Sequence, residues 1–103
     1  MIEILAIPGW QVVETPLSAW ADQFAGQGLA VRLTRESTGV YWIEVTALRL
    51  RGYAVIEDGR RVEAINFEVA APDPSPARDA IVRAASALSW ELHEDDEPDD
   101  NDE

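Results

Sequence analysis

His93 is the single histidine of the chain, and its side chain is the type best suited to proton transfer at neutral pH. A general base must be held against the group that it deprotonates. His93 instead stands at the edge of an acidic run, beside Glu91, Glu94 and Asp95, where a charge pair is the simpler interpretation. We therefore predict no catalytic residue and expect the protein not to be an enzyme.

Other kinds of site chemistry lack their residues. The chain has no cysteine, and all eight basic residues are arginine, which removes thiolate nucleophiles, cysteine-ligated zinc and lysine Schiff bases. The segment Gly26-Gln27-Gly28 follows a predicted helix, whereas a phosphate-binding loop precedes one. The acidic C-terminus contains no glycine and so no EF-hand pattern. We expect neither a cofactor nor a metal site.

Charge is concentrated at the C-terminal end. The formal net charge is −12, and residues 91–103 hold nine of the 20 acidic side chains and no lysine or arginine. This balance excludes a nucleic-acid-binding protein of the usual basic kind. An acidic run either solvates the chain or contacts a basic surface of a protein partner. The acidic residues expected to make such a contact are Glu94, Asp95, Asp96 and Glu97.

The N-terminal part of the chain predicts a short strand and then a helix. The apolar runs Ile2–Ile7 and Trp10–Val13 are separated by Pro8-Gly9, which indicates a small hairpin or an irregular strand. Thr15 is the expected N-cap of a helix that starts at Pro16. Its apolar residues follow helical spacing as far as position 24, and the glycines at positions 26 and 28 end it.

Alternating apolar residues then predict two hairpins. A three-residue loop after position 36 would place Leu33 opposite Ile43, Val31 opposite Val45 and Arg32 opposite Glu44, which matches apolar with apolar and opposite charges with each other. A second hairpin, turning at Asp58-Gly59, would place Leu50 opposite Phe67, Leu48 opposite Val69 and Arg49 opposite Glu68. The inward face changes from odd to even positions near residues 47–48, so a bend is expected there.

A second helix is predicted after the proline-rich connector 71–76, with Ser75 as N-cap and an apolar stripe that runs to Leu92. The expected fold is α+β: a helix, a four-stranded and mainly antiparallel sheet of two hairpins, a helix, and an additional N-terminal strand or hairpin. Residues 1–92 would form a single domain, and residues 93–103 a disordered acidic tail.

Several large apolar side chains fall outside the predicted core. Trp90 lies half a turn from the apolar stripe of the second helix, next to Leu92 at the root of the tail. A further group lies on the sheet face opposite the core: Trp42, Tyr53, Val55 and Val62. Either the N-terminal segment with Trp10 covers that face, or the face is an interface, and a homodimer is the simplest way to bury it.

These observations favour a non-enzymatic protein–protein interaction module, an adaptor or chaperone-like protein with an acidic tail as auxiliary docking element. Two alternatives stay open: a bacterial or phage inhibitor that mimics nucleic acid and blocks a basic surface, and a small-molecule-binding domain. The apolar stretch at the N-terminus is too short for a signal peptide or a membrane span, so we expect a cytoplasmic, bacterial protein with a protein partner and no direct contact with nucleic acid or membrane.

Overall fold

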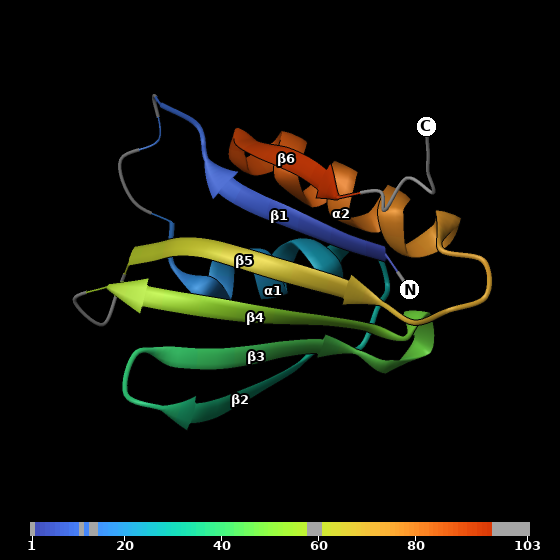
Figure 1. Cartoon of the computed structure of the whole chain (residues 1–103), viewed down its shortest axis with the longest axis horizontal. Coiled ribbons are helices and arrows are strands. Elements are labelled where there is room, and N and C mark those ends of the chain that lie inside the picture. Colours follow the sequence, from blue (N-terminus) through green and yellow to red (C-terminus); the bar gives the residue numbers. More distant parts are fainter. Residues whose placement is uncertain (1, 11, 13–14, 58–60, 96–103) are drawn as a thin grey trace, which may run out of the picture.

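The computed structural model describes residues 2–10, 12, 15–57 and 61–95 of the chain. Within these residues, six strands form one antiparallel sheet, in the order β2-β3-β4-β5-β1-β6 (Figure 1). The strands are β1 (Ile2–Pro8), β2 (Arg32–Ser37), β3 (Val40–Val45), β4 (Leu50–Glu57), β5 (Arg61–Val69) and β6 (Trp90–Asp95). The helices are α1 (Leu17–Gly26) and α2 (Ser75–Leu88), with one 3-10 turn, Thr46–Leu48, between β3 and β4.

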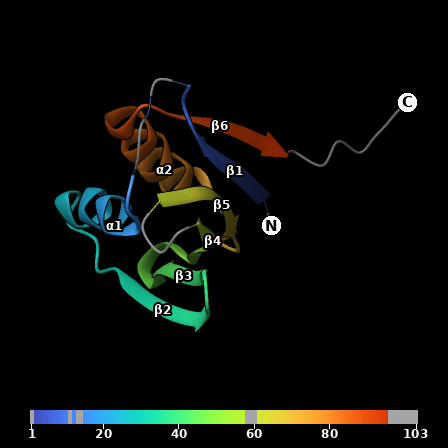
Figure 2. The ribbon, with the colours of Figure 1, turned by 90° about the vertical axis from the view of Figure 1, so that its left-hand side faces the viewer.

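Both helices pack on the same face of the sheet, so the α+β architecture has two layers (Figures 1 and 2). The core between the layers is centred on aromatic rings. Trp20 lies 5.2 Å from Phe67 and 5.3 Å from Trp90, measured between ring centroids, and Phe24 lies 6.1 Å from Phe67. Such tilted and edge-on contacts add to the free energy gained by burying the rings. No helix of the described part of the chain lies on the opposite sheet face (Figure 2).

Helix α1 buries the side predicted from its spacing, through Leu17, Trp20 and Phe24. Gly28 follows it with φ +83°, a conformation that a residue without Cβ adopts easily. The predicted cap is wrong, because Thr15 makes no capping bond and the helix begins at Leu17. The Thr15 hydroxyl instead accepts a hydrogen bond from the indole N–H of Trp90.

The first hairpin has the predicted register away from its turn, but the register shifts between Arg35 and Ser37, and Ser37 pairs with Val40 instead of lying in a three-residue loop. Arg32 pairs with Glu44 and Leu33 with Ile43 across β2 and β3. The expected bend is also present: after the 3-10 turn, Arg49 adopts φ +51°, and the inward positions change from odd in β3 to even in β4. The paired register begins at Arg32–Glu44, so the predicted pair Val31–Val45 falls just outside it, with Val31 directly before the start of β2.

The second hairpin forms with a different register. Leu50 pairs with Val69 rather than Phe67, and Arg51 rather than Arg49 pairs with Glu68, which shifts the predicted register by two residues. An irregularity between Val55 and Ile56, next to the turn, reduces the shift from two residues to one. Because a strand alternates with a period of two, a shift of two leaves the faces of most residues unchanged. The predicted turn at Asp58-Gly59 lies outside the described residues.

Strand β1 is an inner strand rather than one arm of a local hairpin. Its neighbours are β5, by the pair Ile4–Phe67, and β6, by the pair Ile4–Glu94. Its inward residues Ile4 and Ala6 are fully buried. The predicted partner segment 10–13 does not pair with it in the described part of the chain, where Trp10 is 87% exposed.

The C-terminal part of the domain departs most from the expectation. Helix α2 ends at Leu88, Ser89 adopts φ +63°, and the chain then turns back as β6 along the edge of the sheet. The helix does not run to Leu92, and the sixth strand of the sheet is C-terminal rather than the second arm of an N-terminal hairpin. Residues 93–95 belong to β6, whereas residues 96–103 lie outside the described part of the chain.

Candidate functional site

The sheet face opposite the helices is called the open face below. Strand register assigns side chains to it, because residues that pair across neighbouring strands point to the same side. One line of paired positions crosses all six strands and is called the middle row: Thr34, Trp42, Tyr53, Asn66, Leu5 and His93. A parallel line, the apolar row, has Val40, Val55, Ala64 and Ile7 at its four inner positions and ends at polar residues, Ser37 on β2 and Glu91 on β6.

An aromatic pair forms the centre of the open face. The rings of Trp42 and Tyr53 meet edge-on, with centroids 5.0 Å apart. The guanidinium carbon of Arg51 lies 4.5 Å from the centroid of the Trp42 ring, in cation–π contact, and the same group forms an ion pair with Glu68 at 3.4 Å. The Trp42 indole N–H donates to the carboxylate of Glu36. The Trp42 side chain is therefore held by contacts with three other side chains.

The open face is accessible to a partner. Leu5, Tyr53 and Val55 retain 39%, 38% and 38% of their side-chain exposure, although each lies in a paired strand. Beside Leu5 the surface is hollowed into a depression of about 380 Å³, bordered by Glu3, Leu5, Asn66, His93 and Glu94. The face thus combines an aromatic pair on β3 and β4 with a hollow on β5, β1 and β6.

A third line of positions, the charged row, runs along the open face on the other side of the middle row. Its register order from β2 to β6 is Arg32, Glu44, Arg51, Glu68, Glu3 and Asp95. Charges alternate over the first four positions, which favours each cross-strand contact. From Glu68 onward the row is acidic, and the pair Glu3–Glu68 sets like charges side by side.

The structure separates the predicted sheet-face residues. Trp42, Tyr53 and Val55 lie on the open face. Val62 does not: it is fully buried, because the irregularity next to Val55 places it opposite Ile56 on the helix side. The described residues leave the open face uncovered, since Trp10 points into solvent and β1 lies within the sheet rather than across it.

The predicted docking residues at the root of the tail are also divided. Trp90 is 6% exposed and hydrogen-bonded to Thr15, so it belongs to the core rather than to a surface. Leu92 packs half-buried against the core. Glu94 forms a two-pronged ion pair with Arg78 of α2, with distances of 3.0 and 2.7 Å. Asp95 ends β6, in register with Glu3. Asp96 and Glu97 lie outside the described residues.

Sequence reasoning missed Leu5, Asn66, Arg51 and Glu68 as members of the open face. A signal for Leu5 exists, because inward Ile4 and Ala6 require it to point outward. That signal becomes useful only once β1 is known to lie between two other strands. Glu68 was predicted to lie opposite Arg49, and the shift of register in the second hairpin hid its pairing with Arg51.

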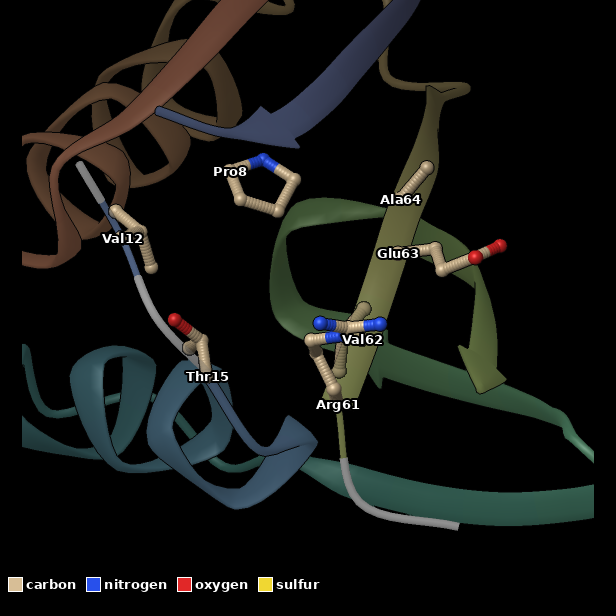
Figure 3. Close-up of a pocket in the computed structure, with 7 residues that line it drawn as sticks. All are labelled: Pro8, Val12, Thr15, Arg61, Val62, Glu63 and Ala64. Atoms are coloured by element: carbon tan, nitrogen blue, oxygen red, sulfur yellow. The ribbon is translucent and has the colours of Figure 1, made fainter. Parts of the chain in front are cut away.

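A separate cavity of about 450 Å³ lies between the segment that follows β1 and the start of β5 (Figure 3). Its lining residues are Pro8, Val12, Thr15, Arg61, Val62, Glu63 and Ala64. The Thr15 hydroxyl already accepts the Trp90 hydrogen bond. Its described lining includes no histidine or cysteine.

Across the described ranges, no group of three or more histidine, aspartate or glutamate side chains converges as metal ligands would. The Nε2 atom of His93 lies 3.7 Å from a carboxylate oxygen of Glu91, and both side chains are more than half exposed. Neither helix of the described part is long and apolar enough to span a bilayer. Comparisons with protein-family models, curated proteins and solved structures find no match.

Proposed function

We propose that this chain is a small, non-enzymatic protein–protein interaction module whose contact surface is the open face. The observation that carries the proposal is the Trp42–Tyr53 pair, with Trp42 half-buried and Tyr53 38% exposed, on a sheet face that no described segment covers. Tryptophan and tyrosine contribute most of the binding energy at many protein interfaces. Contiguous apolar surface of this kind is uncommon on monomers unless a partner or ligand uses it.

Preorganisation supports the same role. A side chain that is already fixed loses little conformational entropy when it is covered by a partner. Trp42 meets this condition through its contacts with Tyr53, Arg51 and Glu36. The antiparallel sheet beneath it gives the face a stable shape, because every strand between the two edges is paired on both sides.

The acidic run acts in this proposal as an auxiliary docking element. Its first acidic residues, Glu91, Glu94 and Asp95, belong to β6 at an edge of the sheet, and the run continues in sequence through Asp96 and Glu97. A run of like charge speeds encounter with a basic surface and is weakened by salt. Glu94 contributes less than the later acids, because its carboxylate is already paired with Arg78.

Site-specific photo-crosslinking in the native host tests the proposal. A photoreactive amino acid replaces Val55 on the open face in one variant and Val82 on α2 in a matched control; the two valines are 38% and 45% exposed. We expect protein adducts from position 55 and few from position 82. Absence of adducts at position 55, or equal adducts at both positions, contradicts the proposal.

A second candidate function, small-molecule binding, is favoured by the cavity shown in Figure 3. Its volume of about 450 Å³ falls in the range of about 300–1,000 Å³ that is usual for ligand sites. A rise of Tm with one compound of a metabolite panel supports this candidate. An unchanged Tm across the panel leaves the interaction module as the single proposal.

A further inference from the structure

We propose that the open face is covered by a second copy of the same chain, related by a twofold axis that runs parallel to the strands between β4 and β5. This inference rests on the proposed function, because it names the partner of the same surface. It comes from the register of the sheet: the rows of the open face are complementary to themselves under that rotation.

An even number of strands makes this symmetry simple. In the order β2-β3-β4-β5-β1-β6, the midpoint of the sheet falls between β4 and β5. A twofold axis along the strands at this point lays β4 over the partner's β5, β3 over the partner's β1, and β2 over the partner's β6. Each row of paired residues then faces the same row of the other copy, as in aligned packing of two sheets.

The middle row brings the aromatic pair of one copy over the hollow side of the other. Trp42 falls over the partner's Leu5, where the depression of about 380 Å³ lies. Tyr53 falls over the partner's Asn66, which can exchange a hydrogen bond with its hydroxyl. Because the axis is twofold, each contact occurs twice. The Trp42 side chain of each copy and the hollow beside Leu5 of the other therefore meet at two symmetric places.

The apolar row is self-complementary as well. Val55 falls over the partner's Ala64, and Val40 over the partner's Ile7. Larger and smaller side chains thus alternate between the facing sheets, as they do in the core of a sheet sandwich. This contact removes the exposed part of Val55 from water without placing a polar group against it.

The charged row adds a ring of four charges around the axis. Arg51 and Glu68 form an ion pair within one copy, and the rotation places each over the opposite charge of the partner. Arg32 falls at the end of the partner's β6, where the acidic run begins. Glu44 falls over the partner's Glu3, which sets two acidic side chains against each other. Arg32 and Arg51 flank Glu44 in its own sheet, and their positive charges offset this repulsion.

The alternative twofold axis, perpendicular to the strands, fits less well. It would lay the charged row over the apolar row, with Arg51 over a valine or alanine of the other copy. An ion pair covered by apolar side chains loses hydration without gaining a new partner. The observed order of rows therefore selects the axis along the strands.

The size of the face agrees with a reversible dimer. Six strands about 4.8 Å apart and three rows of side chains cover about 29 by 20 Å, or roughly 600 Å² per copy. The total of roughly 1,200 Å² lies at the lower limit of specific interfaces. We expect a dissociation constant of about 1–100 μM, in which case the subunits exchange readily.

A pair of complementary variants tests the inference. Leu5→Lys places an ammonium group under the partner's Trp42, and Trp42→Glu places a carboxylate over the partner's Leu5. Each variant alone loses both copies of the contact, so its self-association should weaken at least about tenfold. In an equimolar mixture, one Trp42–Leu5 contact is restored and the two introduced charges face each other at the second. The mixture should form a heterodimer.

The geometry makes this test specific. Within one chain, Leu5 and Trp42 are separated by three strand spacings, about 14 Å, so the introduced charges cannot pair inside a doubly substituted monomer. Sedimentation velocity over a concentration series measures association, and circular dichroism checks that each variant keeps its fold. Val82→Glu on α2 is the matched control and should associate like the natural chain.

The outcomes separate this inference from the proposed function. A natural chain that stays monomeric through the series overturns the inference, as does a dimer that Leu5→Lys leaves intact. If a variant fails to fold, the sedimentation series on the natural chain and the identity of the protein crosslinked at position 55 still decide whether the open face forms a dimer. Adducts at position 55 with a second copy support both proposals. Adducts with a different protein alone support the function and overturn the dimer, and absence of adducts overturns both.

Discussion

The indole N–H of Trp90 donates a hydrogen bond to the hydroxyl of Thr15 at 3.0 Å, inside the core and across 75 positions of the chain. This bond joins the first residue of β6 to the residue that precedes the turn into α1. It also explains why Trp90 is no surface anchor: its ring packs edge-on against Trp20, and its single polar atom is satisfied internally. The C-terminal strand is thereby part of the domain.

Thr15→Val should therefore destabilise the fold while preserving the shape of the side chain. It leaves a buried indole N–H without its acceptor, which costs about 1–3 kcal/mol in the free energy of unfolding. Thr15→Ser keeps the hydroxyl and should lose less. Urea unfolding monitored by tryptophan fluorescence measures both variants. Equal stability of Thr15→Val and the natural chain would show that this hydrogen bond contributes nothing.

Gly52→Ala tests the packing beneath the open face. A Cβ at this position would lie 2.7 Å from Ile43 Cγ2 and 2.8 Å from Phe67 Cδ1, closer than carbon atoms approach. We expect a loss of about 1–3 kcal/mol. Gly26→Ala is the matched control, since its Cβ would meet nothing within 4 Å at the end of α1, and it should be neutral or stabilising by about 0.5–1 kcal/mol. Thermal unfolding compares the two variants.

Truncation separates the strand from the acidic run. A chain that ends after Asp95 keeps β6 and its pairing with β1, so it should retain its Tm while it loses salt-dependent attraction to a basic partner. A chain that ends after Ser89 removes an edge strand and the buried Trp90, and it should unfold at a lower temperature or fail to fold. Calorimetry on both chains distinguishes these effects. Equal Tm values would contradict the structural role of β6.

Charge reversal at the centre of the open face gives a further test of the dimer. Arg51→Glu gathers four acids around the twofold axis, so dimerisation should weaken at least about tenfold. The double variant Arg51→Glu, Glu68→Arg restores opposite charges both within and between copies, and association should recover. Binding to a different protein would not recover in the double variant, because the charges of that protein do not change with those of this chain. Light scattering reports the mass; loss of association in the double variant would contradict the symmetric arrangement.

The parts of the fold that depend on local patterns were predictable from the sequence. The apolar stripe of α1 gave the buried residues Trp20 and Phe24, and matching apolar and charged residues gave the pair Arg32–Glu44. The change of inward face near residues 47–48 also follows from the pattern, and it marks the 3-10 turn. Each of these features is determined by neighbours within about a dozen residues of the sequence.

The parts that depend on distant pairing were not predictable. Strand β1 pairs with β5 and β6, more than 50 residues away, and nothing in Ile2–Ile7 specifies these partners. The apolar helical spacing continues past Leu88 to Leu92, although Leu92 fits a strand equally well. Ser89 ends α2 with a positive φ, but serine is not a residue type that signals the end of a helix. The misplacement of Val62 has a local cause, the irregular register beside Ile56.

The consequence for the candidate site is specific. Trp42, Tyr53 and Val55 were placed on one face because they alternate with core residues, which needs only local periodicity. Leu5 and Asn66 join them only when the order of the six strands is known. The hollow beside Leu5, which completes the surface, is therefore a property of the tertiary structure and has no signature in any single segment.

The measurement that most directly tests whether the open face is a contact surface uses the absence of cysteine from the chain. A single cysteine is introduced by Val55→Cys or, as control, by Val82→Cys; the two positions have similar exposure on opposite sides of the molecule. The rate of maleimide labelling is compared in intact host cells and in dilute purified protein. We predict slow labelling at position 55 in cells, recovery on dilution, and fast labelling at position 82 throughout. Equal rates at both positions in cells would contradict the account.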